Sequence, residues 1–115
     1  MIRLWKALIN SINGLTWALR HEAAVRQEAM ALAIGLPASF IIAASPPWWL
    51  ALVGSLLMLM VVELLNTAVE KLSDHVTPEH SEAIKVVKDL GSTAVLLTLT
   101  VTFLIWVFAI AARFW

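Results

Sequence analysis

Two long uncharged stretches dominate the pattern of hydrophobic and polar positions along this chain. No Asp, Glu, Lys or Arg occurs in the 34 residues between Glu28 and Glu63. The same is true of the 23 residues between Asp89 and Arg113. A helix that crosses a bilayer needs about 20 mainly apolar residues, and a pair of prolines starting at Pro46 divides the first stretch. The pattern therefore predicts three membrane-spanning helices, over about residues 29–44, 48–70 and 92–112.

The N-terminal segment before the first span has a different pattern. Its apolar side chains recur with helical spacing on one face, at Ile2, Trp5, Ile9 and Ile12. Basic and amide side chains occupy other positions, which is typical of a helix that lies in the membrane interface. We therefore expect an amphipathic surface helix over about residues 1–27, broken or bent at the Asn13-Gly dipeptide. Simple anchoring to the membrane explains such a helix as well as a functional role does.

Composition narrows the class of protein. The 115-residue chain is 61% hydrophobic and only 14% charged, with a formal net charge of zero and a mean hydropathy of +0.86. A typical soluble domain has about 25% charged residues. These values exclude an ordinary soluble domain, a disordered chain and a basic binder of nucleic acid. The chain contains no cysteine, so it has no thiolate nucleophile. The composition leaves a membrane protein as the remaining class, and we expect an all-α fold with a single domain over residues 1–115.

The basic residues predict the orientation of the chain. Seven of the eight lie in the N-terminal segment or in the connection between the second and third spans, and only Arg113 lies near the C-terminus. Short loops rich in Lys and Arg stay on the cytoplasmic side of the membrane. We therefore expect the N-terminus and the second connection in the cytoplasm, and the C-terminus outside.

Polar side chains form one narrow stripe along the second span. At about 100° per residue, Glu63, Asn66, Glu70 and Asp74 fall on the same side of the helix. A charged Glu63 in the hydrocarbon would cost at least about 2.5–3.5 kcal/mol, so this residue is a functional candidate. The structural alternative is a protonated Glu63 that holds the helices together by a hydrogen bond. That alternative accounts less well for three carboxylates in a row.

Carboxylates at these depths suit two kinds of chemistry. Glu70 and Asp74, nearer the surface, offer the oxygen ligands that Mg²⁺ prefers, and Mg²⁺ usually arrives with phosphates. Glu63, deeper and less hydrated, is a candidate general base. At the start of the third span, Lys88 suits a contact to a polyphosphate, while Asp89 suits holding a metal or orienting the lysine. Membrane anchoring and an acid in a first helical turn are simpler explanations of that pair alone. The chain has no glycine-rich phosphate loop, so side chains and a metal would have to hold the phosphates.

Three motifs resemble the small integral-membrane diacylglycerol kinases of prokaryotes: EAAVRQE from Glu22, ELLNTAVE from Glu63 together with Asp74, and KDLGSTAV from Lys88. The likeness covers nearly the whole chain, in order and at the spacing of that family. It implies a homotrimeric helical bundle of three-span chains in the bacterial cytoplasmic (inner) membrane, each chain with an N-terminal surface helix. It also implies a kinase that uses ATP and Mg²⁺ to convert diacylglycerol to phosphatidic acid, with undecaprenol as the alternative lipid substrate.

The resemblance also assigns roles to individual residues. Glu63 matches the general base that takes the proton from the lipid hydroxyl, and Asn66 matches a residue that organises this site. Glu22 and Glu70 match the pair that holds the metal on ATP. The remaining matches to nucleotide contacts are Arg3, Asn10, Asp74, Glu79, His80, Lys88 and Asp89, and the matches to lipid contacts are Glu28, Glu63 and Ser92. Two departures bear on nucleotide packing: Asn10 stands where relatives often have an aromatic residue, and IKVV precedes Lys88 where enterobacterial relatives have a Ser-Gly-Arg-Ala-like run.

Two classes of protein other than kinases remain open. A proton-coupled carrier also places carboxylates in the membrane, but it would usually need more spans and has no use for Lys88 and Asp89 beside them. A small structural or regulatory membrane subunit explains the hydropathy but not the acidic stripe. For a kinase, three spans enclose a site poorly, so we expect neighbouring chains of the homotrimer to complete it.

Overall fold

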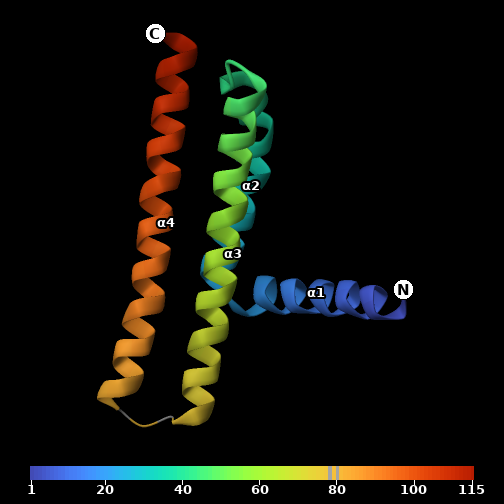
Figure 1. Ribbon diagram of the computed structural model, residues 1–115, viewed down its shortest axis with the longest axis vertical. Helices are drawn as coiled ribbons and strands as arrows, with labels where there is room; N and C mark the ends of the chain where they lie inside the picture. The colour runs from blue at the N-terminus through green and yellow to red at the C-terminus, as the bar shows by residue number, and fades with distance from the viewer. Residues whose placement is uncertain (78, 80) are drawn as a thin grey trace.

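Four helices make up the described part of the chain, which covers residues 1–77, 79 and 81–115 and contains no strand. In this computed structural model the helices are α1 (Ile2–His21), α2 (Ala23–Ile42), α3 (Pro46–Val76) and α4 (Glu82–Phe114). Figure 1 shows α2, α3 and α4 side by side, whereas α1 leaves the base of α2 and runs across their long axis. The predicted all-α architecture is confirmed.

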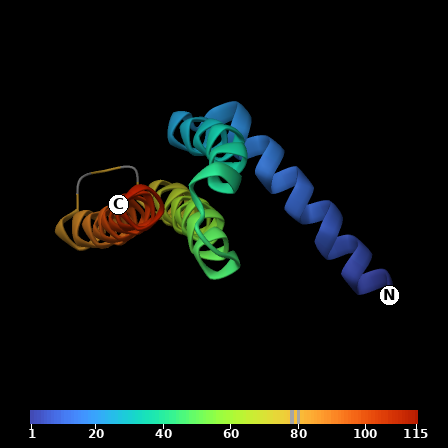
Figure 2. The same cartoon turned by 90° about the horizontal axis from the view of Figure 1, so that it is seen from above.

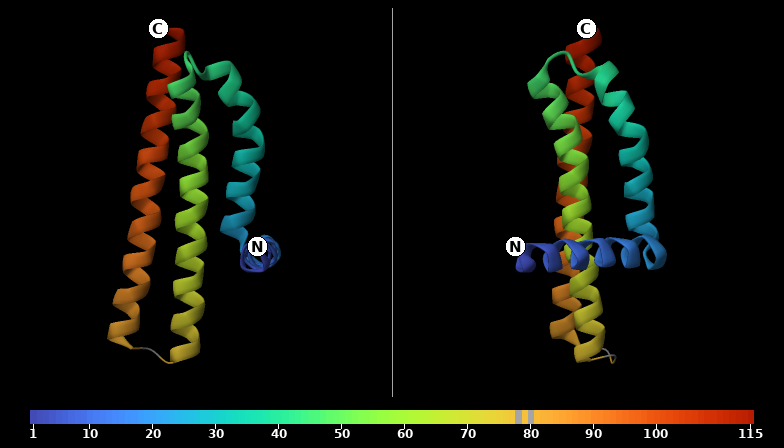
Figure 3. Two further views of the ribbon diagram at one scale, coloured as in Figure 1. Left: turned by 45° about the vertical axis from the view of Figure 1, so that its right-hand side comes forward. Right: turned by 90° about the vertical axis from the view of Figure 1, so that its right-hand side faces the viewer.

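Three of these helices are long and apolar enough to cross a membrane, by length and composition. At 1.5 Å per residue, the 20 residues of α2 span about 30 Å, whereas the 31 of α3 and the 33 of α4 span about 46 and 50 Å. Figure 3 shows where the additional length lies: α3 and α4 continue together past the level of α1. We call residues 71–76 and 82–89 the α3–α4 extension.

The helix boundaries differ from the predicted spans because polar residues continue the helices beyond their apolar parts. α2 begins at Ala23 and α4 at Glu82, ahead of the predicted starts at residues 29 and 92, since the intervening side chains include good helix formers. The two prolines from Pro46 lie inside α3 rather than before it. The first positions of a helix have no partner for an amide N–H, so proline is tolerated there.

α1 ends at His21, short of the predicted residue 27. Glu22, between α1 and α2, has an extended backbone with φ −118° and ψ 115°, so the chain turns there. Arg26 reaches back from the first turn of α2, and its Nη1 donates to two carbonyl oxygens in the last turn of α1, at 3.1 Å each. These carbonyls have no helical partner at the end of α1. We call residues 17–26 the elbow.

The predicted break in the N-terminal helix was wrong. α1 runs without interruption through Asn13 and Gly14, and no glycine in the described residues has a positive φ. A glycine inside a helix costs about 1 kcal/mol, which the other residues of a 20-residue helix offset. Figure 2 shows α1 as one straight rod that stands clear of the other helices over its N-terminal half. Its place at a membrane surface stays a prediction.

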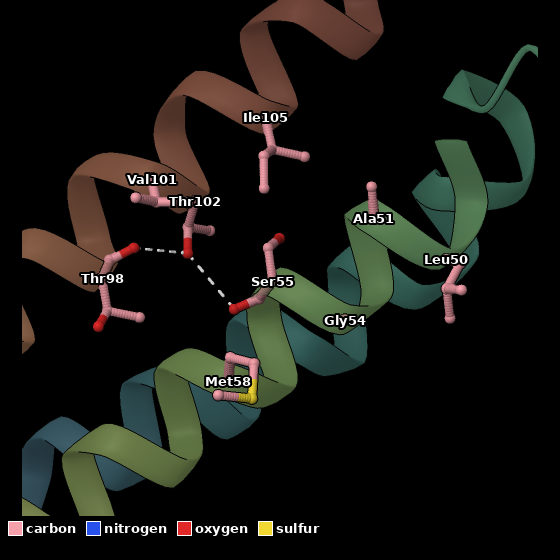
Figure 4. Close-up of a pocket in the computed structure, with 9 residues that line it drawn as sticks. All are labelled: Leu50, Ala51, Gly54, Ser55, Met58, Thr98, Val101, Thr102 and Ile105. Atoms are coloured by element: carbon pink, nitrogen blue, oxygen red, sulfur yellow. Dashed lines mark hydrogen bonds between the residues drawn. The ribbon is translucent and has the colours of Figure 1, made fainter. Parts of the chain in front are cut away.

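Polar contacts join α3 to α4 inside the apolar region. The Thr102 hydroxyl donates to the carbonyl oxygen of Ser55 at 3.3 Å and to that of Thr98 at 2.9 Å (Figure 4). The indole N–H of Trp106 donates to the Ser55 hydroxyl at 3.2 Å. Within a bilayer, hydrogen bonds and close packing rather than the hydrophobic effect drive helix association. This cluster therefore fixes how α3 and α4 face each other.

Large apolar side chains remain exposed along all four helices of the single chain. Phe103 and Phe108 on α4 are 66% and 63% exposed, and Trp5 on α1 is 63% exposed. The fully or nearly buried apolar side chains are few, among them Val25, Leu52 and Ala109. A surface this apolar is covered by lipid or by other protein chains rather than by water. The predicted homotrimer would bury part of it.

We predict that Thr102→Val destabilises the chain by about 0.5–1 kcal/mol, because the variant loses the hydrogen bond from α4 to α3 but keeps the side-chain shape. The matched control is Thr100→Val, since the exposed Thr100 hydroxyl bonds only within its own helix, to the Leu96 carbonyl at 2.9 Å. The measurement is reversible unfolding in mixed micelles. Equal losses for the two variants would show that the Thr102 bond does not hold α3 to α4.

Candidate functional site

A buried carboxylate lies where the apolar part of α3 meets its polar end. Glu63 is only 9% exposed and forms no hydrogen bond or ion pair with any other described residue. The carboxylates of Glu28, Glu70 and Glu22 lie close enough to interact with it electrostatically. They come from α2, from α3 and from the elbow respectively. We call these four residues the acidic cluster.

The helical period of α3 explains half of this cluster. Glu63 and Glu70 are seven residues apart, so two turns bring them to nearly the same side of the helix. Glu28 lies in the second turn of α2, and it reaches the cluster because α2 packs along α3. One of its carboxylate oxygens, Oε2, is buried without a hydrogen-bond partner. An unsatisfied buried oxygen of this kind suits a ligand that brings a donor or a cation.

Asn66 connects the acidic cluster to α4. Its Nδ2 donates to Glu70 Oε1 at 3.3 Å, while its Oδ1 is buried and has no hydrogen-bond partner. That Oδ1 lies against Gly91 of α4, in the space that any Cβ at this position would occupy. A side chain larger than that of glycine at position 91 would therefore displace the Asn66 amide. The close approach of the two helices fixes where this amide points.

Lys71 pairs with a member of the acidic cluster. Its Nζ lies 3.5 Å from Glu22 Oε1 and 5.4 Å from the centre of the Trp17 ring. Trp17 in turn stacks on His21, with ring centres 4.5 Å apart. The lysine of α3 thus contacts the elbow at the end of α1, through Trp17, and at the turn residue Glu22. From the sequence, Lys71 was only a marker of membrane orientation, and no local signal indicated this pairing.

Ion pairs and a small cavity occupy the α3–α4 extension. Lys88 Nζ lies 2.6 Å from Asp74 Oδ1, across the two helices, and Lys85 Nζ lies 2.7 Å from Asp89 Oδ2, within α4. A cavity of about 280 Å³ opens beside them. Its lining residues are Asp74, Thr77, Glu79, Ser81, Ile84, Lys85 and Lys88. Lys85 also lines this cavity, although the family resemblance gives it no role.

The structure brings some predicted nucleotide residues together and leaves others apart. Asp74, Glu79 and Lys88 share the cavity of the extension, whereas His80 lies outside the described residues. Arg3 and Asn10 are exposed on the N-terminal half of α1, which points away from the rest of its own chain (Figure 1). A single chain therefore does not place these two residues at its own acidic cluster.

The predicted lipid-contact residue Ser92 follows Gly91 on α4 and is exposed. It lies next in sequence to the position where α4 approaches Asn66 most closely. The hydroxyl is thus near the level of the acidic cluster, on a surface open to lipid or to another chain.

The carboxylates of the acidic cluster are candidate ligands for Mg²⁺. Among the described residues no group of three or more His, Asp or Glu side chains is arranged to hold a metal ion by itself. Mg²⁺ that arrives on a nucleotide usually takes one or two protein carboxylates and completes its shell with phosphate oxygens and water. Glu22 and Glu70, which both lie within electrostatic range of Glu63, fit that smaller requirement.

Comparison with known proteins places this arrangement in a family. The model of the family described as prokaryotic diacylglycerol kinase matches residues 9–110. The diacylglycerol kinase of Escherichia coli strain K12 is 32% identical over 112 residues, which cover 97% of this chain and 92% of the relative. That of Pseudomonas aeruginosa is 34% identical over 104 residues, covering 90% and 85%, and that of Helicobacter pylori is 37% identical over 105 residues, covering 90% and 81%.

The relatives are bacterial, and the chain has three helices apolar enough to span a membrane. These findings together indicate a bacterial membrane protein. With a family match across most of its length and several relatives that share about a third of its residues, the chain belongs to the prokaryotic diacylglycerol kinase family.

Proposed function

We propose that this protein transfers the γ-phosphoryl group of ATP to the hydroxyl of diacylglycerol and releases phosphatidic acid and ADP. The observation that supports this most strongly is the position of the acidic cluster. Glu63 is buried at the end of the apolar region, and the cavity with Lys85 and Lys88 lies beyond it in the α3–α4 extension. A lipid alcohol arriving from the bilayer and a nucleotide arriving from water would meet there.

The proposed location is the bacterial cytoplasmic (inner) membrane, with the α3–α4 extension in the cytoplasm. Three of the eight basic residues lie on this side of α3 and α4: Lys71, Lys85 and Lys88. Arg113 lies at the opposite end, where its Nε donates to the carbonyl of Ile41 at 3.2 Å. The positive-inside rule then places the N-terminus inside and the C-terminus outside.

Glu63 is the general base of the proposed reaction. Its carboxylate accepts the proton of the diacylglycerol hydroxyl while the hydroxyl oxygen forms a bond to the γ-phosphorus. The bond from that phosphorus to the β–γ bridging oxygen breaks, and ADP leaves with the electron pair. Asn66 positions this site through its contact with Gly91 and its bond to Glu70. A positioned base contributes roughly 10²- to 10⁴-fold to such a step.

The other site residues hold the nucleotide in place, which is the larger part of catalysis in phosphoryl transfer. Glu22 and Glu70 would bind Mg²⁺ on ATP, and the ion would neutralise phosphate charge. Lys88 would contact the phosphates once it exchanges Asp74 for the nucleotide, whereas Asp89 would act at the phosphate end through a bound metal ion or through a lysine that it orients. Asp74, Glu79 and His80 would form the nucleotide-side wall.

The complete site is proposed to form between chains of a homotrimer. α1, which contains Arg3 and Asn10, points away from the other helices of its own chain (Figure 2), so these residues would serve the nucleotide of a neighbour. The exposed apolar surface of α2 and α4 leaves room for such neighbours. Glu28 and Ser92 would contact the lipid substrate at the same boundary.

We predict that the purified protein in lipid, supplied with ATP and Mg²⁺, phosphorylates diacylglycerol faster than undecaprenol. Radiolabelled phosphate in the extracted lipid measures both rates, and a reaction without Mg²⁺ is the control. Faster labelling of undecaprenol would make it the substrate instead. A lack of label in either lipid would reject the kinase function for this chain.

We predict that Glu63→Gln lowers kcat by at least roughly 10²-fold and leaves the oligomer intact, because the amide keeps the shape but cannot accept the proton. Size-exclusion chromatography in detergent checks the assembly, and the lipid phosphorylation rate checks turnover. Turnover near that of the unmodified protein would remove Glu63 from the role of base.

We predict that Gly91→Ala lowers kcat roughly tenfold or more, because the new Cβ displaces the Asn66 amide from its place beside Glu70. Gly14→Ala is the matched control, since nothing lies within 4 Å of a Cβ added in α1. The same phosphorylation assay reports both variants. Equal activity of the two would show that the Asn66–Gly91 contact does not position the site.

A further inference from the structure

A positively charged side chain already sits beside the acidic cluster. Lys71 follows Glu70 on α3, but its Nζ contacts the elbow, 3.5 Å from Glu22 Oε1 and 5.4 Å from the centre of the Trp17 ring. The lysine and Glu22 are 56% and 24% exposed at the side chain. Neither the family resemblance nor the proposed mechanism assigns a role to Lys71.

Repulsion within the acidic cluster favours a positive charge beside it, whether or not a nucleotide is bound. Glu63 interacts electrostatically with Glu22, Glu28 and Glu70, and repulsion among carboxylates grows as water becomes scarce around them. Lys71 supplies one charge of the required sign. Ion pairs with this much exposure contribute only about 0.2–1 kcal/mol, so this one can be exchanged at small cost.

We propose that Lys71 is the resident counter-cation of the acidic cluster and that a divalent cation displaces it from Glu22. The proposal rests on the proposed function, in which Glu22 is a ligand of Mg²⁺. An ammonium beside that carboxylate repels an incoming metal ion and competes for the same oxygen. Once displaced, the long and exposed lysine side chain keeps its contact with the Trp17 ring. Lys71 would thus set how tightly the site holds its metal.

The test is Mn²⁺ binding to the full-length protein in lipid nanodiscs, without nucleotide or lipid substrate, followed by electron paramagnetic resonance. We expect Lys71→Gln to bind Mn²⁺ roughly three- to tenfold more tightly than the unmodified protein, because it removes the competitor and its repulsion. Lys71→Arg keeps the charge, so its Mn²⁺ affinity should stay within about twofold of that of the unmodified protein. Lys6→Gln on α1 is the matched control for the same change in net charge, and it should also stay within about twofold.

A second pair of variants isolates the contact. In a Glu22→Gln background, Lys71→Gln should no longer tighten Mn²⁺ binding, because the shared carboxylate is gone. Unchanged or weaker Mn²⁺ binding by Lys71→Gln alone would overturn the proposal, and so would tightening that persists without the Glu22 carboxylate. Because the measurement needs no phosphoryl transfer, tighter binding by a chain that labels neither lipid would uphold the exchange while rejecting the kinase function.

Discussion

The cost of placing carboxylates at the edge of a hydrocarbon layer constrains the whole structure. An acidic side chain in an apolar span carries a penalty of a few kcal/mol, and several together also repel one another. The chain nevertheless gathers Glu63, Glu28, Glu70 and Glu22 at the end of its apolar region. Helix packing accounts for how they meet, but it does not require them. In the proposed function, the Mg²⁺ that arrives with ATP supplies positive charge beside these carboxylates.

Contacts between the helices hold the acidic cluster at one level of the helical bundle. Because Gly91 has no side chain, the Asn66 amide of α3 can lie directly against α4. The Ser55–Thr102 contact fixes the same two helices further along the apolar part. At the elbow, Arg26 holds the end of α1 while Glu22 turns toward α3. Each of these contacts is weak by itself. Together, at several positions along the helices, they hold the helices in their relative positions.

Much of this organisation could be predicted from the sequence, because uncharged runs and a helical period are local signals. The three long apolar helices and the acidic stripe of α3 follow from such signals, and the family follows from three motifs. The elbow could not be predicted, because the turn at Glu22 depends on Arg26 reaching two carbonyls in the preceding helix. The pairing of Lys71 with Glu22 could not be predicted either. These residues are 49 positions apart and meet only because α1, α2 and α3 pack together.

In the proposed mechanism, Glu63 accepts a proton at the membrane boundary. The most direct test is to label the glutamate carboxyl carbons with ¹³C, assign Glu63 by comparison with Glu63→Gln, and titrate its resonance in bilayers alongside the turnover rate. A base must be ionised to act, so turnover should rise with pH over the same interval in which the Glu63 resonance shows loss of its proton. If Glu63 stays protonated throughout the pH range in which the protein phosphorylates lipid, Glu63 is not the general base.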